Sequence, residues 1–147
     1  MAKNVVIIGG GASGLMAAIW ASRLGAVVTV LEKNDKPGRK LLATGNGRCN
    51  FTNRYQDASC YRTGNQERAS RVLEQFTEQD TEQFFEQLGI RIRSREGWLY
   101  PASEQAQSVL ELLILEARFR KVKIKTRETA VAVEKAENGY LVRTEGW

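Results

Sequence analysis

The chain has 147 residues, of which 42% are hydrophobic, so it is long enough to bury one core of its own. It has no histidine and only two cysteines, Cys49 and Cys60, which excludes a Cys/His zinc site and a Ser–His or Cys–His catalytic pair. The formal net charge of +5 favours an anionic ligand without identifying one. Two isolated cysteines do not form the disulfide framework of a small secreted domain, so we expect a reducing compartment, the cytoplasm.

The N-terminal region predicts a strand, a helix and a second strand. Val5–Ile8 is an apolar, β-branched run that ends in glycine, the pattern of a parallel strand covered on both faces. Residues 12–24 are good helix formers, and Gly25 stands where a C-terminal cap belongs. Val27–Leu31 is a second buried strand, so the three elements predict one βαβ crossover. We expect Trp20, on the helix, to lie in the core.

The next segment, Asn34–Arg62, is rich in Gly, Asn, Thr and Arg and has no sustained periodicity. This composition predicts a long loop, and long loops inside compact domains are usually functional or disordered. Two helices are expected after it, over residues 66–76 and 78–88. Thr77 is the predicted cap of the second helix, and Gly89 the residue that ends it.

The C-terminal half predicts a mixture of strands and one long helix. Residues 90–100 predict a short β-hairpin that turns at Glu96-Gly97. Ser103 is the predicted N-cap of a helix that runs to about Arg120, because apolar residues recur there at helical spacing. Three strands are expected at the end of the chain, over residues 122–125, 129–135 and 140–144, the last two joined by a turn at Asn138-Gly139.

The motif Gly9-x-Gly11-x-x-Gly14 falls between the first predicted strand and the first predicted helix, and Glu32 ends the following strand. This context turns a weak glycine pattern into a dinucleotide-binding fingerprint. Gly9 permits the tight turn, Gly11 leaves room for a pyrophosphate, and Gly14 lets helix and strand pack closely. The free N–H groups at the helix start then face the phosphates. The residues expected to contact the cofactor at this turn are Gly9, Gly11, Ala12, Ser13 and Gly14.

Glu32 is suited to accept hydrogen bonds from both ribose hydroxyls of the nucleotide. Its charge repels the 2′-phosphate of NADP, although the neighbouring Lys33 weakens this exclusion slightly. The fingerprint therefore favours FAD or NAD and leaves the choice between them open.

The loop sequence bears on that choice. Residues 37–53 read PGRKLLATGNGRCNFTN, and residues 97–106 read GWLYPASEQA. Both stretches resemble the FAD-dependent oxidoreductases related to aminoacetone oxidase and to certain bile-acid reductases. The resemblance covers essentially the whole chain and implies a Rossmann-like α/β fold, an FAD/NAD(P)-binding fold with a parallel sheet.

The resemblance also implies a role for particular residues. Glu32 would hold the adenosine ribose, Arg39 and Lys40 the region around ribose and phosphates, and the backbone at Ala130 the adenine edge. The residues implied to lie near the flavin ring are Asn46, Gly47, Arg48, Cys49 and Asn50. The residue types agree, because glycines allow positive φ and close approach to a flat ring, while amide and guanidinium groups can bind its carbonyl oxygens.

In the family that the chain resembles, a later strand with an Ala-Thr-Gly-Gly type motif completes the FAD domain, and a separate domain binds the substrate. Neither is found in residues 1–147, which we therefore interpret as the N-terminal part of the FAD-binding domain, without its C-terminal completion and substrate domain. We expect this part to keep the adenosine and pyrophosphate half-site, to bind FAD weakly or not at all in isolation, and to be inactive alone.

The function predicted for the whole protein is an FAD-dependent oxidoreductase that transfers a hydride between flavin and a small organic substrate, with NAD(P)H as a candidate electron donor. No catalytic residue, metal site or oligomeric state is predicted, and no stretch is long and apolar enough to span a bilayer. One alternative is an NAD-dependent dehydrogenase. Another is a flavin-containing RNA-modifying protein, which would suit the net charge and the arginines of residues 54–71. That segment shows no interleaved aromatic platform, so nucleic acid is the less favoured partner.

Overall fold

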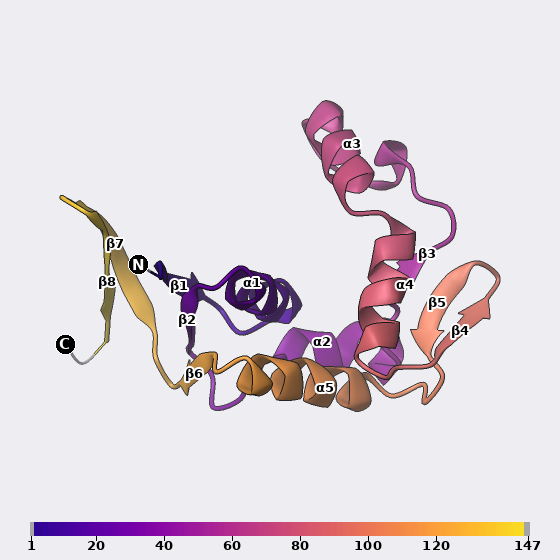
Figure 1. Cartoon of the computed structure of the whole chain (residues 1–147). Helices are drawn as coiled ribbons and strands as arrows, with labels where there is room; N and C mark the ends of the chain where they lie inside the picture. The colour runs from indigo at the N-terminus through magenta and orange to yellow at the C-terminus, as the bar shows by residue number, and fades with distance from the viewer. Residues whose placement is uncertain (1, 146–147) are drawn as a thin grey trace. The chain divides into compact units, whose positions relative to one another are not determined.

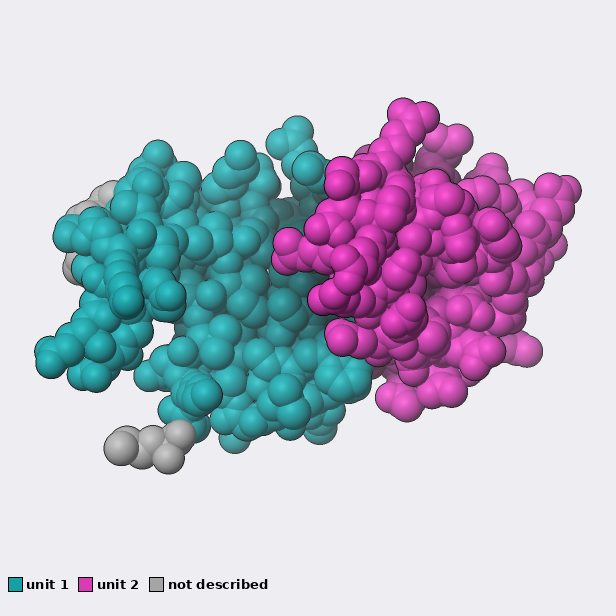
Figure 2. Space-filling view, turned by 90° about the horizontal axis from the view of Figure 1, so that it is seen from above, with its two compact units in different colours: residues 1–41, 110–147 teal, residues 42–109 magenta. Residues whose placement is uncertain are grey.

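The computed structural model describes residues 2–145 and divides the chain into two compact units (Figure 2). Unit 1 combines residues 1–41 with residues 110–147, and unit 2 consists of residues 42–109. Most of the elements labelled in Figure 1 lie within one unit, while the helices over residues 39–43 and 106–119 contribute residues to both, and each unit carries its own part of the predicted site. None of the helices in the described part of the chain has the length and apolar character that crossing a membrane requires.

Unit 1 contains a parallel sheet of three strands in the order β1-β2-β6. Strand β1 (Asn4–Ile8) pairs with β2 (Val27–Glu32), and helix α1 (Ala12–Arg23) connects the two. Strand β6 (Lys123–Thr126) pairs with the other edge of β2, also in parallel. The βαβ unit predicted from the sequence is therefore confirmed, and its bounds differ from the prediction by one residue at several ends.

The core of unit 1 lies between the sheet and α1. Leu15, Ala18 and Ile19 of the helix are fully buried, as are Val28 and Val30 of the central strand. Burying a large aliphatic side chain contributes about 1.5–3 kcal/mol, so this contact holds the glycine turn between β1 and α1 in place. The helix ends as predicted, with Gly25 at φ +85° just beyond it.

Two burial predictions for this unit are wrong. The first strand was expected to be covered on both faces, yet Val6 is 46% and Ile8 54% exposed. Helix α1 covers only one face of the sheet, and alternate residues of a strand point to opposite faces, so these two side chains lie on the open face. Trp20 is 41% exposed rather than buried, and the guanidinium of Arg23 lies 5.1 Å from the centre of its ring.

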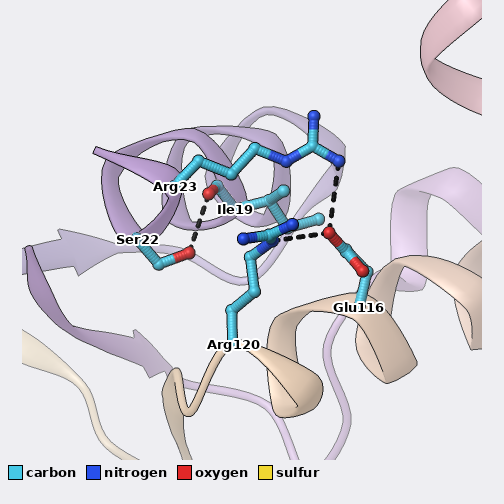
Figure 3. A network of polar contacts seen from close by, with 5 residues as sticks. All are labelled: Ile19, Ser22, Arg23, Glu116 and Arg120. Carbon is cyan, nitrogen blue, oxygen red and sulfur yellow. Dashed lines mark hydrogen bonds and ion pairs between the residues drawn. The ribbon is translucent and has the colours of Figure 1, made fainter. Parts of the chain in front are cut away.

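A polar network joins the end of α1 to helix α5 (Ala106–Phe119) (Figure 3). Oε1 of Glu116 accepts from Nη2 of Arg23 at 3.2 Å and from Nε of Arg120 at 2.6 Å. Burial acts to raise the pKa of Glu116, but the two guanidinium donors and their charges outweigh it and hold this pKa below its usual value. At the same helix end, Ser22 donates to the carbonyl of Ile19 at 2.7 Å.

The remaining strands of unit 1 form a two-stranded antiparallel hairpin, β7 (Ala130–Ala136) and β8 (Gly139–Thr144). Gly139 has φ +145° at the predicted turn. The strands expected over residues 129–135 and 140–144 are thus confirmed to within one residue at each end.

The segment predicted as a continuous loop is wrong in detail. It contains four short elements, namely α2 (Arg39–Ala43), the 3₁₀ helices η1 (Thr44–Gly47) and η2 (Ala58–Cys60), and strand β3 (Thr52–Asn53). Each is five residues or shorter, so none is long enough to show a hydrophobic period in the sequence.

Unit 2 contains the two predicted helices, α3 (Gln66–Gln75) and α4 (Glu78–Gln87). Thr77 caps α4 as expected, through a capping box in which its hydroxyl accepts from the N–H of Asp80 at 3.2 Å and the carboxylate of Asp80 accepts from the N–H of Thr77 at 2.7 Å. Gly89 follows α4 with φ +86°.

The predicted hairpin of unit 2 is confirmed as β4 (Ile92–Arg95) and β5 (Trp98–Pro101), and β3 adds a third strand beside β5. Phe84 and Phe85 of α4 are buried, and the ring of Phe85 stacks on that of Phe51 with 4.2 Å between centroids.

Ser103 does not cap α5 as predicted, because the helix begins only at Ala106. Glu104 has φ +51°, a left-handed conformation that no right-handed helix can include, so the helix must begin after it. The hydroxyl of Ser103 instead lies 2.7 Å from that of Ser108.

Candidate functional site

The glycine turn has the geometry that its motif predicts. Gly9 has φ +99°, and its N–H donates to the carbonyl of Leu31 at 2.7 Å, which ties the turn to β2. A Cβ on Gly14 would collide with the carbonyl oxygen of Gly9. Only glycine can therefore stand at position 14 while the start of α1 lies this close to the end of β1.

The start of α1 is open to an anion. A Cβ on Gly11 would meet no atom within 4 Å, so the space in front of this residue is free. The helix has no side-chain N-cap and no acidic residue in its first turn. The N–H groups of Ala12 and Ser13 have no acceptor among the described residues. Unpaired donors, the positive end of the helix dipole and open space together fit a phosphate group.

Glu32 lies at the end of β2 with its carboxylate beside the glycine turn. Oε2 accepts from the N–H of Gly10 at 2.8 Å, and Oε1 accepts from the backbone N–H of Asn34 at 2.8 Å and from its Nδ2 at 2.6 Å. Each carboxylate oxygen can accept about two hydrogen bonds, so Oε2 keeps capacity for a hydroxyl donor. The site therefore combines phosphate donors with one buried acceptor, as a ribose and pyrophosphate require.

The charge of Glu32 is maintained by these contacts. Burial is the largest influence and acts to raise the pKa of this carboxyl group. The hydrogen bonds from Asn34 and Gly10 outweigh the burial, with a smaller contribution from the charge of Lys33, so the pKa of Glu32 lies below its ordinary value. Glu32 is thus ionised at neutral pH although it is buried.

Two residues of this site were not predicted from the sequence. Gly10 fixes the carboxylate, and a Cβ at this position would approach Pro37 and Glu32 too closely. Asn34 supplies two of the three hydrogen bonds that Glu32 receives. An asparagine two positions after the acidic residue is the only signal that could have indicated this role.

The basic residues predicted for this region follow the same turn. The N–H of Gly38 donates to the carbonyl of Gly10 at 2.8 Å and so attaches the beginning of α2 to the glycine turn. A Cβ on Gly38 would collide with the side chain of Leu110, and its φ is +78°, so glycine is required here as well. Arg39 and Lys40 come next and are exposed.

The backbone of Ala130 is predicted to contact adenine. Two residues shortly before it in the chain are hydrogen-bonded to the end of β2 and the residues that follow it. The N–H of Glu128 donates to the carbonyl of Glu32 at 3.0 Å, and that of Arg127 donates to the carbonyl of Asn34 at 2.9 Å. The chain that leads to Ala130 is therefore attached to Glu32, which also accepts a hydrogen bond from the glycine turn.

The predicted flavin loop lies in unit 2 and has an unusual backbone. Gly45, Asn46 and Gly47 have φ +55°, +54° and +81°, so three consecutive residues are left-handed, and Cys49 follows at +60°. Positive φ was expected of this loop and is confirmed. For the non-glycine residues it costs about 1–3 kcal/mol each, and strain of this kind concentrates at functional sites.

The side-chain amide of Asn50 has a structural role that was not expected. This group was considered as a donor to carbonyl oxygens of a flavin. Instead Nδ2 donates to the carbonyls of Thr52 and Leu99, both at 3.0 Å, and so fastens the loop to β5. Arg48 and Asn46 are exposed.

Burial raises the pKa of the Cys49 thiol. The hydrogen bond with Thr44 lowers this pKa by less than burial raises it, so Cys49 is a neutral thiol at pH 7.

The site residues thus fall into two sets, each within one unit. Unit 1 brings together the glycine turn, Glu32, the basic pair and the segment of Ala130, and unit 2 holds the residues of the left-handed loop. Residues 3–146 match the family model described as the HI0933-like protein Rossmann domain. The chain belongs to the HI0933-like family. This match confirms the Rossmann fold predicted from the glycine motif, and it also supports the sequence resemblance described above.

Two curated relatives extend this assignment. The HI0933-like chain is 50% identical over 146 residues to the 3-dehydro-bile acid delta(4,6)-reductase of Clostridium scindens, covering 98% of this chain and 36% of that protein. It is 31% identical over 144 residues to the ribosomal RNA dihydrouridine synthase of Escherichia coli, covering 97% of this chain and 36% of that protein. The chain therefore spans about a third of the length of these relatives.

Solved structures share the fold at low sequence identity. The 3-ketosteroid-delta4-(5alpha)-dehydrogenase of Rhodococcus jostii, solved with 4-androstene-3,17-dione, superposes with a TM-score of 0.68 at 13% identity, covering 99% of the HI0933-like chain and 43% of that chain. CtdE, solved in complex with FAD, superposes with a TM-score of 0.53 at 19% identity, covering 99% and 35%. At these identities the likeness shows the fold alone.

Proposed function

We propose that the chain is the FAD-binding part of an oxidoreductase that transfers a hydride between flavin and a small organic substrate. The observation that carries the proposal is the glycine turn of unit 1, where unpaired N–H groups of Ala12 and Ser13 face open space beside the carboxylate of Glu32. The FAD that CtdE binds on the same fold supports the choice of cofactor. The flavin supplies the redox chemistry, and the chain binds and orients it.

Each part of the proposed site has a distinct role. The N–H groups at the start of α1 bind the pyrophosphate, and Oε2 of Glu32 accepts from the adenosine ribose. Arg39 and Lys40 neutralise phosphate charge, and the backbone at Ala130 contacts the adenine. In unit 2 the loop of Asn46 to Asn50 contacts the flavin ring, where Arg48 stabilises negative charge.

The variant Gly11→Ala tests the cofactor site without disturbing the fold. A Cβ at position 11 meets no protein atom, and Gly11 has φ −75°, which alanine adopts freely. The melting temperature should therefore be unchanged or slightly higher. The same Cβ would enter the space of the pyrophosphate, so the affinity of the whole protein for FAD and for ADP, measured by isothermal titration calorimetry, should fall at least about tenfold.

The control is Gly64→Ala in unit 2, where a Cβ also meets no atom and φ is not positive. This variant should bind FAD as the unchanged chain does. Equal affinity of Gly11→Ala and the unchanged chain would contradict the pyrophosphate site. An absorbance spectrum of the protein as purified from its cells, followed by identification of the released cofactor, separates FAD from the NAD of a dehydrogenase.

The relatives narrow the type of reaction. A reductase of a delta(4,6) compound and a synthase of dihydrouridine, as their names describe them, both add hydrogen to a carbon–carbon double bond. We infer that the present chain serves the same type of reaction on a small molecule. Cys49 and Cys60 are both free, which supports the proposal of a reducing compartment such as the cytoplasm.

RNA modification is a second candidate, favoured by the dihydrouridine synthases among the relatives and by one observation on β6. Lys123 and Lys125 occupy alternate positions of this strand, Lys121 and Arg127 flank it in the sequence, and all four are exposed. Alternate strand residues share a face, so Lys123 and Lys125 lie on the same side of β6, where two exposed cations suit a phosphate backbone. Binding of ribosomal RNA to filters at two salt concentrations tests this candidate, which requires affinity that falls steeply with salt.

The arginine-rich segment of unit 2 supports RNA binding less than its sequence suggests. Arg54 pairs with Glu82 at 2.7 Å, and Arg71 pairs with Glu67 one helical turn away, so two of its cations are already neutralised. The segment does contain two exposed aromatic side chains, Tyr55 and Tyr61.

A further inference from the structure

Unit 2 contains a pocket that, among the proposed cofactor contacts, only Asn50 lines. Its volume is about 520 Å³, and its walls come from β3 and the loop after it, η2, the end of α3 and the first turn of α4. Pockets of about 300–1,000 Å³ are the usual size for small-molecule ligands. All of its lining residues belong to unit 2.

Aromatic and polar side chains together form the walls of this pocket. Phe51, Tyr55, Tyr61, Phe76 and Trp98 line it. Trp98 is 49% and Tyr61 42% exposed, so both leave ring surface available to a ligand. Phe51 is held from behind by its stacking on Phe85. Flat, partly exposed rings at fixed positions suit a ligand that is itself flat.

Hydrogen bonds within the chain already orient polar groups of the pocket wall before a ligand binds. The hydroxyl of Tyr61 donates to Oε1 of Gln56 at 2.6 Å, and Nε2 of Gln56 donates to Oγ1 of Thr52 at 2.7 Å. This chain of hydrogen bonds fixes the ring of Tyr61 relative to β3. Rings that are already held in place lose little conformational entropy on binding.

The charge of the wall selects against anions. None of the described residues that line the pocket is a lysine or arginine, and one, Glu78, is acidic. Asn50 and Asn53 also line it, and each uses one end of its amide within the chain: Nδ2 of Asn50 donates to backbone carbonyls, and Oδ1 of Asn53 accepts from the N–H of Tyr55 at 2.8 Å. The opposite amide ends remain for a carbonyl or N–H group of an uncharged ligand.

Asn50 connects this pocket with the proposed flavin loop, because it is the last residue of that loop and also lines the pocket. We propose that the pocket binds the ring of the substrate, and that the substrate is an uncharged, flat cyclic carbonyl compound. The proposal rests on the proposed function, since it is the flavin at the adjoining loop that makes a ring in this pocket a reactant. The nitrogen ring of a pyrimidine and the ketone ring of a steroid both have this chemistry.

The experiment measures binding of two probes, uridine and 4-androstene-3,17-dione, by equilibrium dialysis against the whole protein loaded with FAD. Tyr61→Ala and Trp98→Ala should each weaken binding of the preferred probe about tenfold, because each removes one stacking surface. Trp98→Phe keeps a ring and should bind within about threefold of the unchanged protein. The probe that binds more tightly identifies the source of the ring.

Tyr140→Ala is the matched control, since Tyr140 is an exposed aromatic of β8 in unit 1, outside the pocket. This variant should bind both probes unchanged. Failure of both probes to bind, or unchanged affinity in Tyr61→Ala and Trp98→Ala, would overturn the proposal. Affinity for FAD is measured in parallel. If the unchanged protein does not bind FAD, the proposed function is wrong. If it binds FAD but neither probe, only the proposal for the pocket is wrong.

Discussion

Units 1 and 2 recognise their proposed ligands by different means. In unit 1 the site is built from backbone N–H groups, glycines and a single buried carboxylate. In unit 2 the pocket is built from aromatic and amide side chains. Cationic residues outnumber acidic ones in unit 1, whereas the two are nearly balanced in unit 2. The first unit is thus arranged for an anion of fixed shape, and the second for an uncharged ring.

The difference has a consequence for substitution. A site made of backbone N–H groups depends on the backbone conformation of its glycines. A single Cβ that prevents this conformation can therefore abolish binding. A site of side chains changes in affinity by smaller steps, because each ring contributes its own part of the contact. Substitutions in the two units should therefore differ in kind as well as in size.

The largest expected effect is that of Gly14→Ala in unit 1. The new Cβ collides with the carbonyl oxygen of Gly9, and backbone atoms cannot move aside as the tip of a side chain can. We expect a loss of about 3 kcal/mol or more in the free energy of unfolding, measured by urea denaturation, together with loss of FAD binding. Gly64→Ala, which meets no atom, should stay within about 0.5 kcal/mol. A Gly14→Ala chain of normal stability would show that α1 and β1 are not packed as described.

Glu32→Gln should have an intermediate effect that depends on pH. At pH 7 the variant should be less stable by about 1–3 kcal/mol, because a glutamine offers one acceptor oxygen where Gly10 and Asn34 use two. The pKa of Glu32 is depressed in the folded chain, so its contribution is fully present above the ordinary pKa of a glutamate and is lost as pH falls through the lower, folded value.

Thermal unfolding between pH 3 and pH 7 measures this dependence. The difference between Glu32→Gln and the unchanged chain should shrink as the solution is acidified. The exposed Glu137 gives the control variant Glu137→Gln, which should follow the unchanged chain at every pH. A stability gap that stays constant with pH would mean that the charge of Glu32 is not what its hydrogen bonds stabilise.

The smallest expected effect concerns the polar network between α1 and α5. Glu116→Gln weakens the bonds to Arg23 and Arg120 and should cost about 1 kcal/mol, because the network is only partly buried. Glu134→Gln breaks the exposed pair with Arg143 and should cost about 0–0.5 kcal/mol. Chemical denaturation of both variants measures the difference. Equal losses would show that the network adds nothing beyond an ordinary surface ion pair.

Much of the fold could be predicted because its signals are local. The apolar runs of β1 and β2, the helix between them and the capping residue Thr77 each depend on a few neighbouring residues. The errors arose where a distant contact or a single backbone angle decides the outcome. Ser103 fails as a cap because Glu104 is left-handed, and Trp20 is exposed because no described part of the chain covers it fully.

The sequence by itself determined the glycine turn and its acidic partner, since the spacing of Gly9, Gly11 and Gly14 between a strand and a helix already dictates where the N–H groups point. Only the tertiary structure decided that Gly10 and Asn34 hold Glu32 in place, and that the rings of Phe51, Tyr61 and Trp98 line one pocket. The physical reason is that a turn is specified by the conformational freedom of adjacent residues, whereas a pocket exists only once segments far apart in the chain have packed together.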